Sequence, residues 1–312
     1  MPLSLLNPVS FARYESDFAG FSRDLGESFR RYGFAVISDH GLGQERIDRA
    51  LAQAKAFFAL PEAVKQKYFI EGGKGQRGYT PFGVETAKGA THFDLKEFWH
   101  VGRDLPPGHR YEPDMPANVW PDETPDFRAE VGWLFSALDA MGGRVLQAVA
   151  NHLDLDRDAF QGPVKDGNSI LRLLHYPASG FDGPNVRAGA HEDINVITLL
   201  LGAEEGGLQV LDRDGQWLPI NPPAGTLVIN IGDMLSRATN DLLPSTTHRV
   251  VNPPPERRGV ARYSTPFFLH YAPDHLIETL PGCVGPDRPN RYPQPITAAN
   301  FLARRLAEIK LG

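Results

Sequence analysis

The chain has 312 residues, enough for one large domain or two closely merged ones. Apolar residues make up 41% and charged residues 22%, the proportions of an ordinary globular protein. The formal net charge of −6 argues against nucleic acid as a general partner.

Three further features bear on where the protein acts. The single cysteine, Cys283, cannot form an internal disulfide, so the fold needs no oxidising compartment. No apolar run approaches the ~20 residues that cross a bilayer, and the N-terminus shows no basic, apolar leader. We therefore expect a cytoplasmic protein with no membrane partner. No pattern in the sequence sets an oligomeric state.

Residues 1–125 are expected to form an N-terminal α/β region with loops that cover a substrate. Aromatic and apolar residues recur at spacings of three and four from Phe11 to Tyr32, which predicts one long helix that ends at Gly33. A short strand over 34–38 and a second apolar helix follow. We interpret the aromatic stripe as packing against a β-core.

The stretch 71–125 is rich in glycine and proline, and we expect one strand in it, over 94–99. Loops of this kind often carry substrate contacts. Arg77, Tyr79 and Phe82 are therefore candidate substrate contacts, although ordinary loop anchoring would explain them equally well.

Residues 126–312 are expected to hold a linking helix over 126–152, a β-rich core and a C-terminal helix over 298–309. Short apolar runs separated by turn residues suggest a jelly roll. The fold class we predict is mainly β with flanking helices: a double-stranded β-helix core behind an N-terminal helical region. The strands are expected at 169–176, 194–200, 207–211, 216–220, 226–231, 247–251 and 262–271.

A histidine and an aspartate precede the apolar strand near residue 195. If His191 and Asp193 belong to that strand, alternation directs both to one face and Glu192 to the other. Two histidines and one carboxylate on one side of an ion are typical of non-haem Fe(II) oxygenases. His248, on a later β-type run, is the best candidate for the second histidine.

A second pair of polar residues strengthens this hypothesis. Arg262 and Ser264 share one face of a later strand, and a guanidinium with a hydroxyl is suited to bind a buried carboxylate. Asn230, Asp233 and Thr198 are instead expected to serve structural roles.

Together these residues resemble the Fe(II)/2-oxoglutarate-dependent dioxygenases of the isopenicillin N synthase-like superfamily. The resemblance extends over nearly the whole chain, through the motifs His191-x-Asp193, His248 and Arg262-x-Ser264 and the stretches 33–41, 171–177, 230–235 and 240–251. The sequence has Asp39 where the family usually has asparagine, and Leu174 where related plant enzymes usually have asparagine.

The resemblance implies how the site works. Fe(II) would be held by the two histidines and the aspartate, and 2-oxoglutarate by Arg262, Ser264 and the phenol of Tyr176. With O2 as oxidant, 2-oxoglutarate would yield succinate and CO2, while a C–H bond of a small-molecule substrate is hydroxylated, desaturated or used for ring closure.

Strand alternation adds candidate substrate residues. Arg172 shares the face of Tyr176 and would pair with an acidic group of the substrate, unless it forms a surface or interdomain salt bridge. Phe268 and His270 continue the alternation of Arg262 and Ser264, so they are expected to line the pocket. His100 is assigned no role.

Two alternatives stay open at this stage. In isopenicillin N synthase itself the Arg-x-Ser pair holds a substrate carboxylate, so an Fe(II) oxidase that does not use 2-oxoglutarate is one. A non-catalytic jelly-roll protein that binds a metal or ligand is the other. The residues do not identify the substrate.

Overall fold

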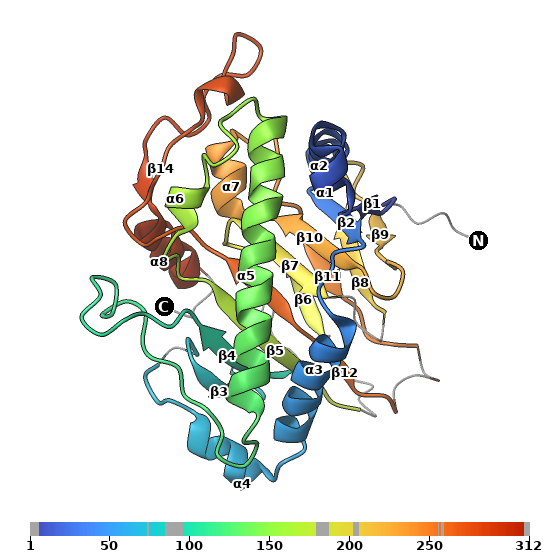
Figure 1. Ribbon diagram of the computed structural model, residues 1–312, viewed down its shortest axis with the longest axis vertical. Helices are drawn as coiled ribbons and strands as arrows, with labels where there is room; N and C mark the ends of the chain where they lie inside the picture. Colours follow the sequence, from blue (N-terminus) through green and yellow to red (C-terminus); the bar gives the residue numbers. More distant parts are fainter. Residues whose placement is uncertain are drawn as a thin grey trace.

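The structure, a computed structural model, describes residues 6–73, 75–84, 96–178, 187–201, 206–254, 256 and 259–308. Its centre is two β-sheets that form a double-stranded β-helix, covered on one side by helices (Figure 1). The large sheet has the order β1-β2-β10-β7-β13-β5-β4-β3, with β12 also paired to β5, and the small sheet has the order β6-β11-β8-β9. The predicted fold class is therefore confirmed.

The N-terminal segment is not one helix, as we expected, but a strand and two helices. These are β1 (Val9–Ser10), α1 (Arg13–Ser16) and α2 (Phe18–Tyr32). Asp17 separates the helices because its backbone is not helical and its side chain accepts a hydrogen bond from the N–H of Gly20. Gly33 ends α2 with a φ of 69°, as predicted.

The rest of the N-terminal region continues the large sheet. The elements are β2 (Phe34–Ser38), α3 (Gln44–Phe58), α4 (Glu62–Lys65), η1 (Gln66–Tyr68), β3 (Gly78–Thr80) and β4 (Glu97–Gly102). β4 begins and ends later than the strand expected at 94–99, of which residues 94 and 95 lie outside the described residues. Since β2 pairs with β10 and β4 with β5, both halves of the chain build one sheet. The boundary at residue 125 stays a prediction.

Helix α5 (Phe127–His152) runs across the outer face of the large sheet, beside α2 and α3 (Figure 1). Its buried side chains join the main core, together with the aromatic residues of α2 and α3. Gly142 permits this close packing, because a Cβ there would lie 2.4 Å from Leu269 Cδ1 in the sheet. The opposite face of the sheet is left for the interior of the barrel.

The jelly-roll strands follow the expected order with two differences. They are β5 (Ile170–Tyr176), β6 (Ala188–His191), β7 (Ile197–Leu201), β8 (Leu208–Leu211), β9 (Trp217–Pro219), β10 (Leu227–Ile231), β11 (His248–Val250), β12 (Arg262–Ser264) and β13 (Pro266–Leu269). β6 was not predicted, and the run expected at 262–271 is two strands. Both of these strands, β12 and β13, pair with β5, but only β13 also pairs with β7.

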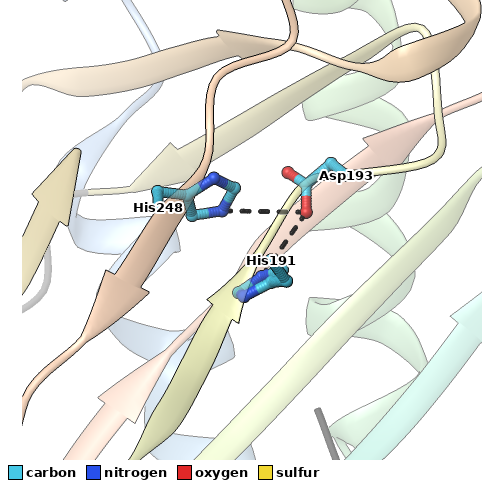
Figure 2. Close-up of side chains that lie close together, drawn as sticks. All are labelled: His191, Asp193 and His248. Carbon is cyan, nitrogen blue, oxygen red and sulfur yellow. Dashed lines mark ion pairs between the residues drawn. The ribbon is translucent and has the colours of Figure 1, made fainter. Parts of the chain in front are cut away.

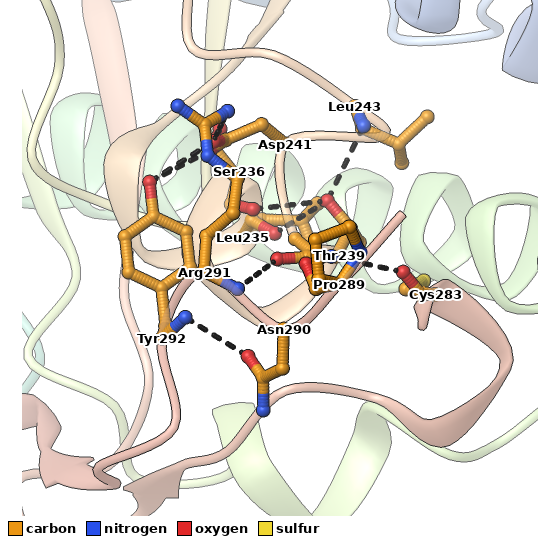
Figure 3. A network of polar contacts seen from close by, with 11 residues as sticks. Leu235, Ser236, Thr239, Asp241, Leu243, Cys283, Pro289, Asn290, Arg291 and Tyr292 are labelled. Carbon is orange, nitrogen blue, oxygen red and sulfur yellow. Dashed lines mark hydrogen bonds and ion pairs between the residues drawn. The ribbon is translucent and has the colours of Figure 1, made fainter. Parts of the chain in front are cut away.

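The C-terminal segment makes polar contacts with the residues that follow α7 (Asp233–Ala238), the helix after β10. Its elements are β14 (Leu276–Ile277), η3 (Pro281–Cys283), β15 (Ile296–Thr297) and α8 (Ala298–Glu308). One short helix, α6 (Gln161–Val164), lies earlier in the chain, between α5 and β5. Figure 3 shows the polar network, in which Tyr292 and Arg291 both bind the carboxylate of Asp241. Asn240 reaches the carbonyls of Cys283 and Pro289. The C-terminal helix predicted to residue 309 is described to residue 308.

The described helices include none that is both long and apolar enough to pass through a membrane.

Candidate metal centre

Three side chains meet where the two sheets approach each other (Figure 2). His191 ends β6 and lies directly opposite His248, the first residue of the antiparallel strand β11. The Nε2 atoms of both histidines lie 3.8 Å from Oδ1 of Asp193. One ligand atom from each residue lies within 4.8 Å of the other two. The sequence prediction that these residues converge is thus matched by the geometry.

The reason for the convergence differs from the one we gave. His191 and Asp193 do not lie on one strand, because β6 ends at His191 and β7 begins at Ile197. Asp193 is in the connection, where the chain leaves the small sheet for the large one. A turn between the sheets, not strand alternation, therefore brings the carboxylate beside the imidazoles.

The Asp193 carboxylate is held by two donors inside the barrel. Thr198 Oγ1 donates to Oδ2 at 2.5 Å, and Asn230 Nδ2 donates to the same oxygen at 2.8 Å. Asn195 Nδ2 in turn donates to Thr198 Oγ1 at 2.9 Å. Our structural assignments of Thr198 and Asn230 were therefore incomplete: both leave Oδ1 directed at the histidines, as the outer partners of metal ligands do.

The two imidazoles present their Nε2 atoms to the same point. His191 Nδ1 donates to the Gly189 carbonyl at 2.7 Å, and His248 Nδ1 donates to the Thr246 carbonyl at 3.1 Å. Because carbonyls only accept, each Nδ1 carries a proton, which leaves Nε2 as the ring nitrogen that can bind a metal. Burial, aided by the neighbouring His248, lowers the pKa of His191 to about 4. At neutral pH the imidazole is thus in the form that binds metals.

The acidic side chain of Asp193 is also kept ionised. Burial favours its neutral form, but His248, His191 and the hydrogen bonds from Asn230 and Thr198 outweigh burial and lower its pKa. Two imidazoles and one carboxylate, grouped on one side, fit Fe(II) with positions left open for other ligands.

Helix α8 supports the turn that carries Asp193. The Asp233 N–H donates to the Asp193 carbonyl at 2.8 Å, and the Asp233 carboxylate lies 3.0 Å from Arg305 of α8. Arg305 also lies 3.9 Å from Glu192. Asp233 therefore holds a turn, as expected, and the C-terminal helix anchors it.

Arg262, Ser264 and Tyr176 form a second group in the barrel. Arg262 lies directly opposite Tyr176 on the paired strands β12 and β5, with its guanidinium carbon 5.2 Å from the phenol ring centre. All three side chains are buried, and Ser264 shares the face of Arg262. One cation and two hydroxyls are the donor set that a buried carboxylate requires.

Three of the candidate substrate residues, Arg172, Phe268 and His270, lie in or beside the sheet face that carries Thr198. Phe268 is directly opposite Thr198, and the charge of Asp193 favours the protonated form of His270. Burial lowers the pKa of His270 to about 4. Arg77 is also buried, close to Gly102 at the end of β4.

Tyr79 was placed wrongly among the substrate contacts. It lies opposite Trp99 in the core beneath α3, and its hydroxyl donates to Glu97 at 2.5 Å. Phe82 is 38% exposed at a turn. His100, to which we assigned no role, has a defined place in the sheet. It lies on β4 opposite Arg172, and extending the predicted strand by one residue beyond 94–99 would have included it.

A jelly roll with this donor set has the features of a non-haem iron oxygenase, and comparisons agree. Residues 6–123 match the family model "non-haem dioxygenase in morphine synthesis N-terminal", and residues 167–271 match that of the 2OG-Fe(II) oxygenase superfamily. The 2-oxoglutarate-Fe(II) type oxidoreductase hxnY of Emericella nidulans is 35% identical, over 90% of this chain and 82% of its own.

Solved structures give the same result. A 2OG-Fe(II) oxygenase family protein from Caulobacter crescentus has 65% identity and a TM-score of 0.93, over 98% of this chain and 99% of its own. A full-length protein of Neurospora crassa, solved in complex with alpha-KG and thymine, has 29% identity and a TM-score of 0.85, over 98% of both chains.

The chain therefore belongs to the 2OG-Fe(II) oxygenase superfamily. It is an oxidoreductase that depends on Fe(II), 2-oxoglutarate and O2 and oxidises a small molecule. The predicted family, activity and cofactors are confirmed.

Proposed function

We propose that His191, Asp193 and His248 hold the iron, and that Arg262, Ser264 and Tyr176 hold the far carboxylate of 2-oxoglutarate. The observation that supports the first assignment most directly is the 3.8 Å separation of both histidine Nε2 atoms from Asp193 Oδ1. Three ligands about 2 Å from one ion lie at separations of this order.

When bound, the iron would let O2 oxidise a substrate C–H bond by hydroxylation, desaturation or ring closure, with one oxygen atom entering succinate as 2-oxoglutarate loses CO2 and the other entering the product or leaving as water. The protein contributes fixed positions and charge. Thr198 and Asn230 keep Asp193 Oδ1 aimed at the ion, so little reorganisation is needed on binding. Arg262 compensates a carboxylate that would otherwise be costly to bury.

Arg172, Phe268 and His270 are the residues that we propose to contact the substrate. Their shared face with Thr198 supports this assignment. The thymine in the Neurospora crassa complex is a small, flat ring, which supports a substrate of similar size here. The net charge of −6 supports a small molecule over nucleic acid. We also infer a cytoplasmic location without a membrane partner, to be tested by cell fractionation.

A direct test is to load the purified protein with Fe(II) under anaerobic conditions, titrate 2-oxoglutarate by calorimetry, and then measure succinate after adding O2 and ascorbate. We expect one 2-oxoglutarate per chain and slow succinate formation even without substrate. Asp193→Ala should abolish both metal binding and turnover, whereas Asp214→Ala, in an exposed hairpin turn, serves as the matched control.

Two results would favour the alternatives. Oxygen uptake that needs a substrate but not 2-oxoglutarate would indicate an isopenicillin N synthase-type oxidase. A bound metal without oxygen consumption under any of these conditions would indicate a binding protein.

A further inference from the structure

The residues next to the three proposed iron ligands are joined to each other on the side away from the ion. His191 lies directly opposite His248, so their chain neighbours Glu192 and Thr247 project to the other side. Thr247 Oγ1 donates to Glu192 Oε1 at 2.6 Å. This hydrogen bond ties the segment that carries His191 and Asp193 to the segment that carries His248.

The first turn of α7 holds the connection that carries Asp193. The N–H of Asp233 donates to the Asp193 carbonyl at 2.8 Å, and the N–H of Met234 donates to the Asn195 carbonyl at 3.1 Å. The Asn195 amide in turn donates to Thr198, whose hydroxyl donates to the Asp193 carboxylate. The placement of α7 therefore bears on both the backbone and the side chain of Asp193.

One side chain of α8 contacts both of these braces. Arg305 Nη2 lies 3.0 Å from Asp233 Oδ2 and 3.9 Å from Glu192 Oε2. The side chains of Arg305 and Asp233 are 23% and 14% exposed, so this pair is largely shielded from water. The longer contact, to the more exposed Glu192, is the weaker of the two. A single guanidinium therefore touches the neighbours of all three proposed ligands, directly or through one hydrogen bond.

The preceding arginine, Arg304, lacks this contact. Arg304 Nε lies 3.5 Å from Glu308 Oε1, and Arg305 Nη1 lies 2.7 Å from Glu308 Oε2, so both arginines pair with the same glutamate of α8. The Arg304 side chain is 75% exposed, and within the described part of the chain it forms no ion pair outside α8. Since exposed ion pairs contribute little to stability, the two arginines differ mainly in the contact of Arg305 with the turn of Asp193.

Helix α8 is attached to the body of the protein, so it can hold Arg305 in place. The strand before it, β15, pairs with β14, and the N–H of the buried Ala298 donates to the His275 carbonyl at 2.9 Å. Phe301 and Leu302 pack against the main hydrophobic core. The helix is therefore placed by contacts of its own, and Arg305 transmits its position to the metal centre.

We propose that Arg305 is a positioning residue for the iron, and that docking of α8 and binding of the metal stabilise one another. This inference rests on the proposed iron site. With Arg305 in place, the three ligand-bearing segments are joined through Asp233 and Glu192, so less order has to be created when the ion binds. Because coupling between two sites is reciprocal, a bound ion should in turn hold α8 more firmly.

The charge of Arg305 opposes this effect. A positive charge near a metal site repels the ion, so its removal by itself would favour metal binding. The guanidinium is paired with Asp233 and partly exposed to solvent, and both reduce the repulsion. We therefore expect the loss of position to outweigh the loss of repulsion. A lysine variant, which keeps the charge, separates the two effects.

The test compares Arg305→Gln, Arg305→Lys and the matched control Arg304→Gln. Metal-free protein is titrated by calorimetry with Mn(II), an inert substitute for Fe(II). Arg305→Gln should bind Mn(II) about 3- to 30-fold more weakly than the native protein, the range expected for a residue that acts through its neighbours. Arg305→Lys should recover part of this loss, because an ammonium group can still pair with Asp233. Arg304→Gln should bind Mn(II) as the native protein does.

A second readout separates positioning from a general loss of stability. Hydrogen exchange of the backbone amides of α8 should slow when Mn(II) binds to the native protein or to Arg304→Gln. This protection should be absent in Arg305→Gln at a Mn(II) concentration that saturates it. Thermal melting of the metal-free variants shows whether each one folds. If Arg305→Gln does not fold, the lysine variant and the exchange of α8 in the native protein decide.

Equal Mn(II) affinity in Arg305→Gln and the native protein would overturn the proposal. Tighter binding in Arg305→Gln would do so as well, by showing that charge and not position is the dominant effect. An effect of Arg304→Gln as large as that of Arg305→Gln, or exchange of α8 that Mn(II) leaves unchanged in the native protein, would also contradict it. If the native protein fails to bind Mn(II), the proposed function is refuted instead, which distinguishes the two failures.

Discussion

Thr198 and Asp193, five residues apart in the chain, are joined by a hydrogen bond of 2.5 Å that determines which carboxylate oxygen faces the metal centre. Oδ2 receives both this hydroxyl and the amide of Asn230, and Oδ1 remains 3.8 Å from each histidine Nε2. The orientation of this proposed metal ligand therefore depends on side chains of the large sheet.

Replacing Thr198 by valine should weaken metal binding, because the side chain keeps its shape but loses its donor. Outer partners of metal ligands typically contribute about 10- to 100-fold in affinity. We expect a loss in this range for Mn(II), measured by calorimetry. Thr226→Val, which removes a hydroxyl bound to the Pro223 carbonyl, is the control. Unchanged affinity in Thr198→Val would show that Asn230 alone orients the carboxylate.

Arg262→Gln should weaken 2-oxoglutarate binding, since a buried carboxylate would lose its cation. Truncating one partner of such a pair costs about 2–5 kcal/mol. Titration of the Mn(II)-loaded variant with 2-oxoglutarate measures this loss. Arg249→Gln, on the small sheet beside Trp217, is the matched control. If 2-oxoglutarate bound equally well, the group opposite Tyr176 would have been assigned the wrong ligand.

Arg77→Met should stabilise the free protein, because it removes a buried charge whose donors are mostly unused among the described residues. An unsatisfied buried polar group costs about 1–3 kcal/mol, and methionine fills similar space. Urea unfolding should therefore shift to higher concentration. Arg77→Lys keeps the charge and should not be more stable than the native protein. Clear destabilisation by methionine would indicate a packing role instead.

Glu97→Gln should destabilise the protein at neutral pH. Glu97 accepts from Lys65 at 2.6 Å, from His175 at 2.7 Å and from Tyr79 at 2.5 Å. Burial favours the neutral acid, but these donors outweigh it and lower the pKa of Glu97 below its ordinary 4.5. Breaking a buried ion pair costs about 3–5 kcal/mol.

The sign of the pH dependence follows from that lowered pKa. The stabilisation by Glu97 is present above pH 4.5, the ordinary pKa of glutamate, and is lost as the pH falls through the lower pKa in the folded protein. The difference in unfolding free energy between Glu97→Gln and the native protein should therefore be largest near pH 7 and shrink below pH 4.5. Glu45→Gln, whose side chain is 92% exposed, should show no such trend.

The sequence by itself determined the fold class and the identity of the chemical groups. Apolar alternation and turn residues locate most jelly-roll strands, because burial on one face of a sheet imposes a period of two. The pattern His191-x-Asp193 with His248, and Arg262-x-Ser264, can be read without coordinates because these side chains lie close together along the chain or belong to recurrent motifs.

Only the tertiary structure showed which side chains contact one another. Thr198 and Asn230 come from neighbouring strands, and their hydrogen bonds to Asp193 depend on strand pairing across the sheet. Tyr79 lies in the core and His100 on the opposite face of the sheet, because the register of β3 and β4 was not visible in a stretch of glycine and proline. Contacts between residues far apart in sequence depend on which strands pair and in which register, and here the local pattern of residues 71–125 was too weak to fix that register.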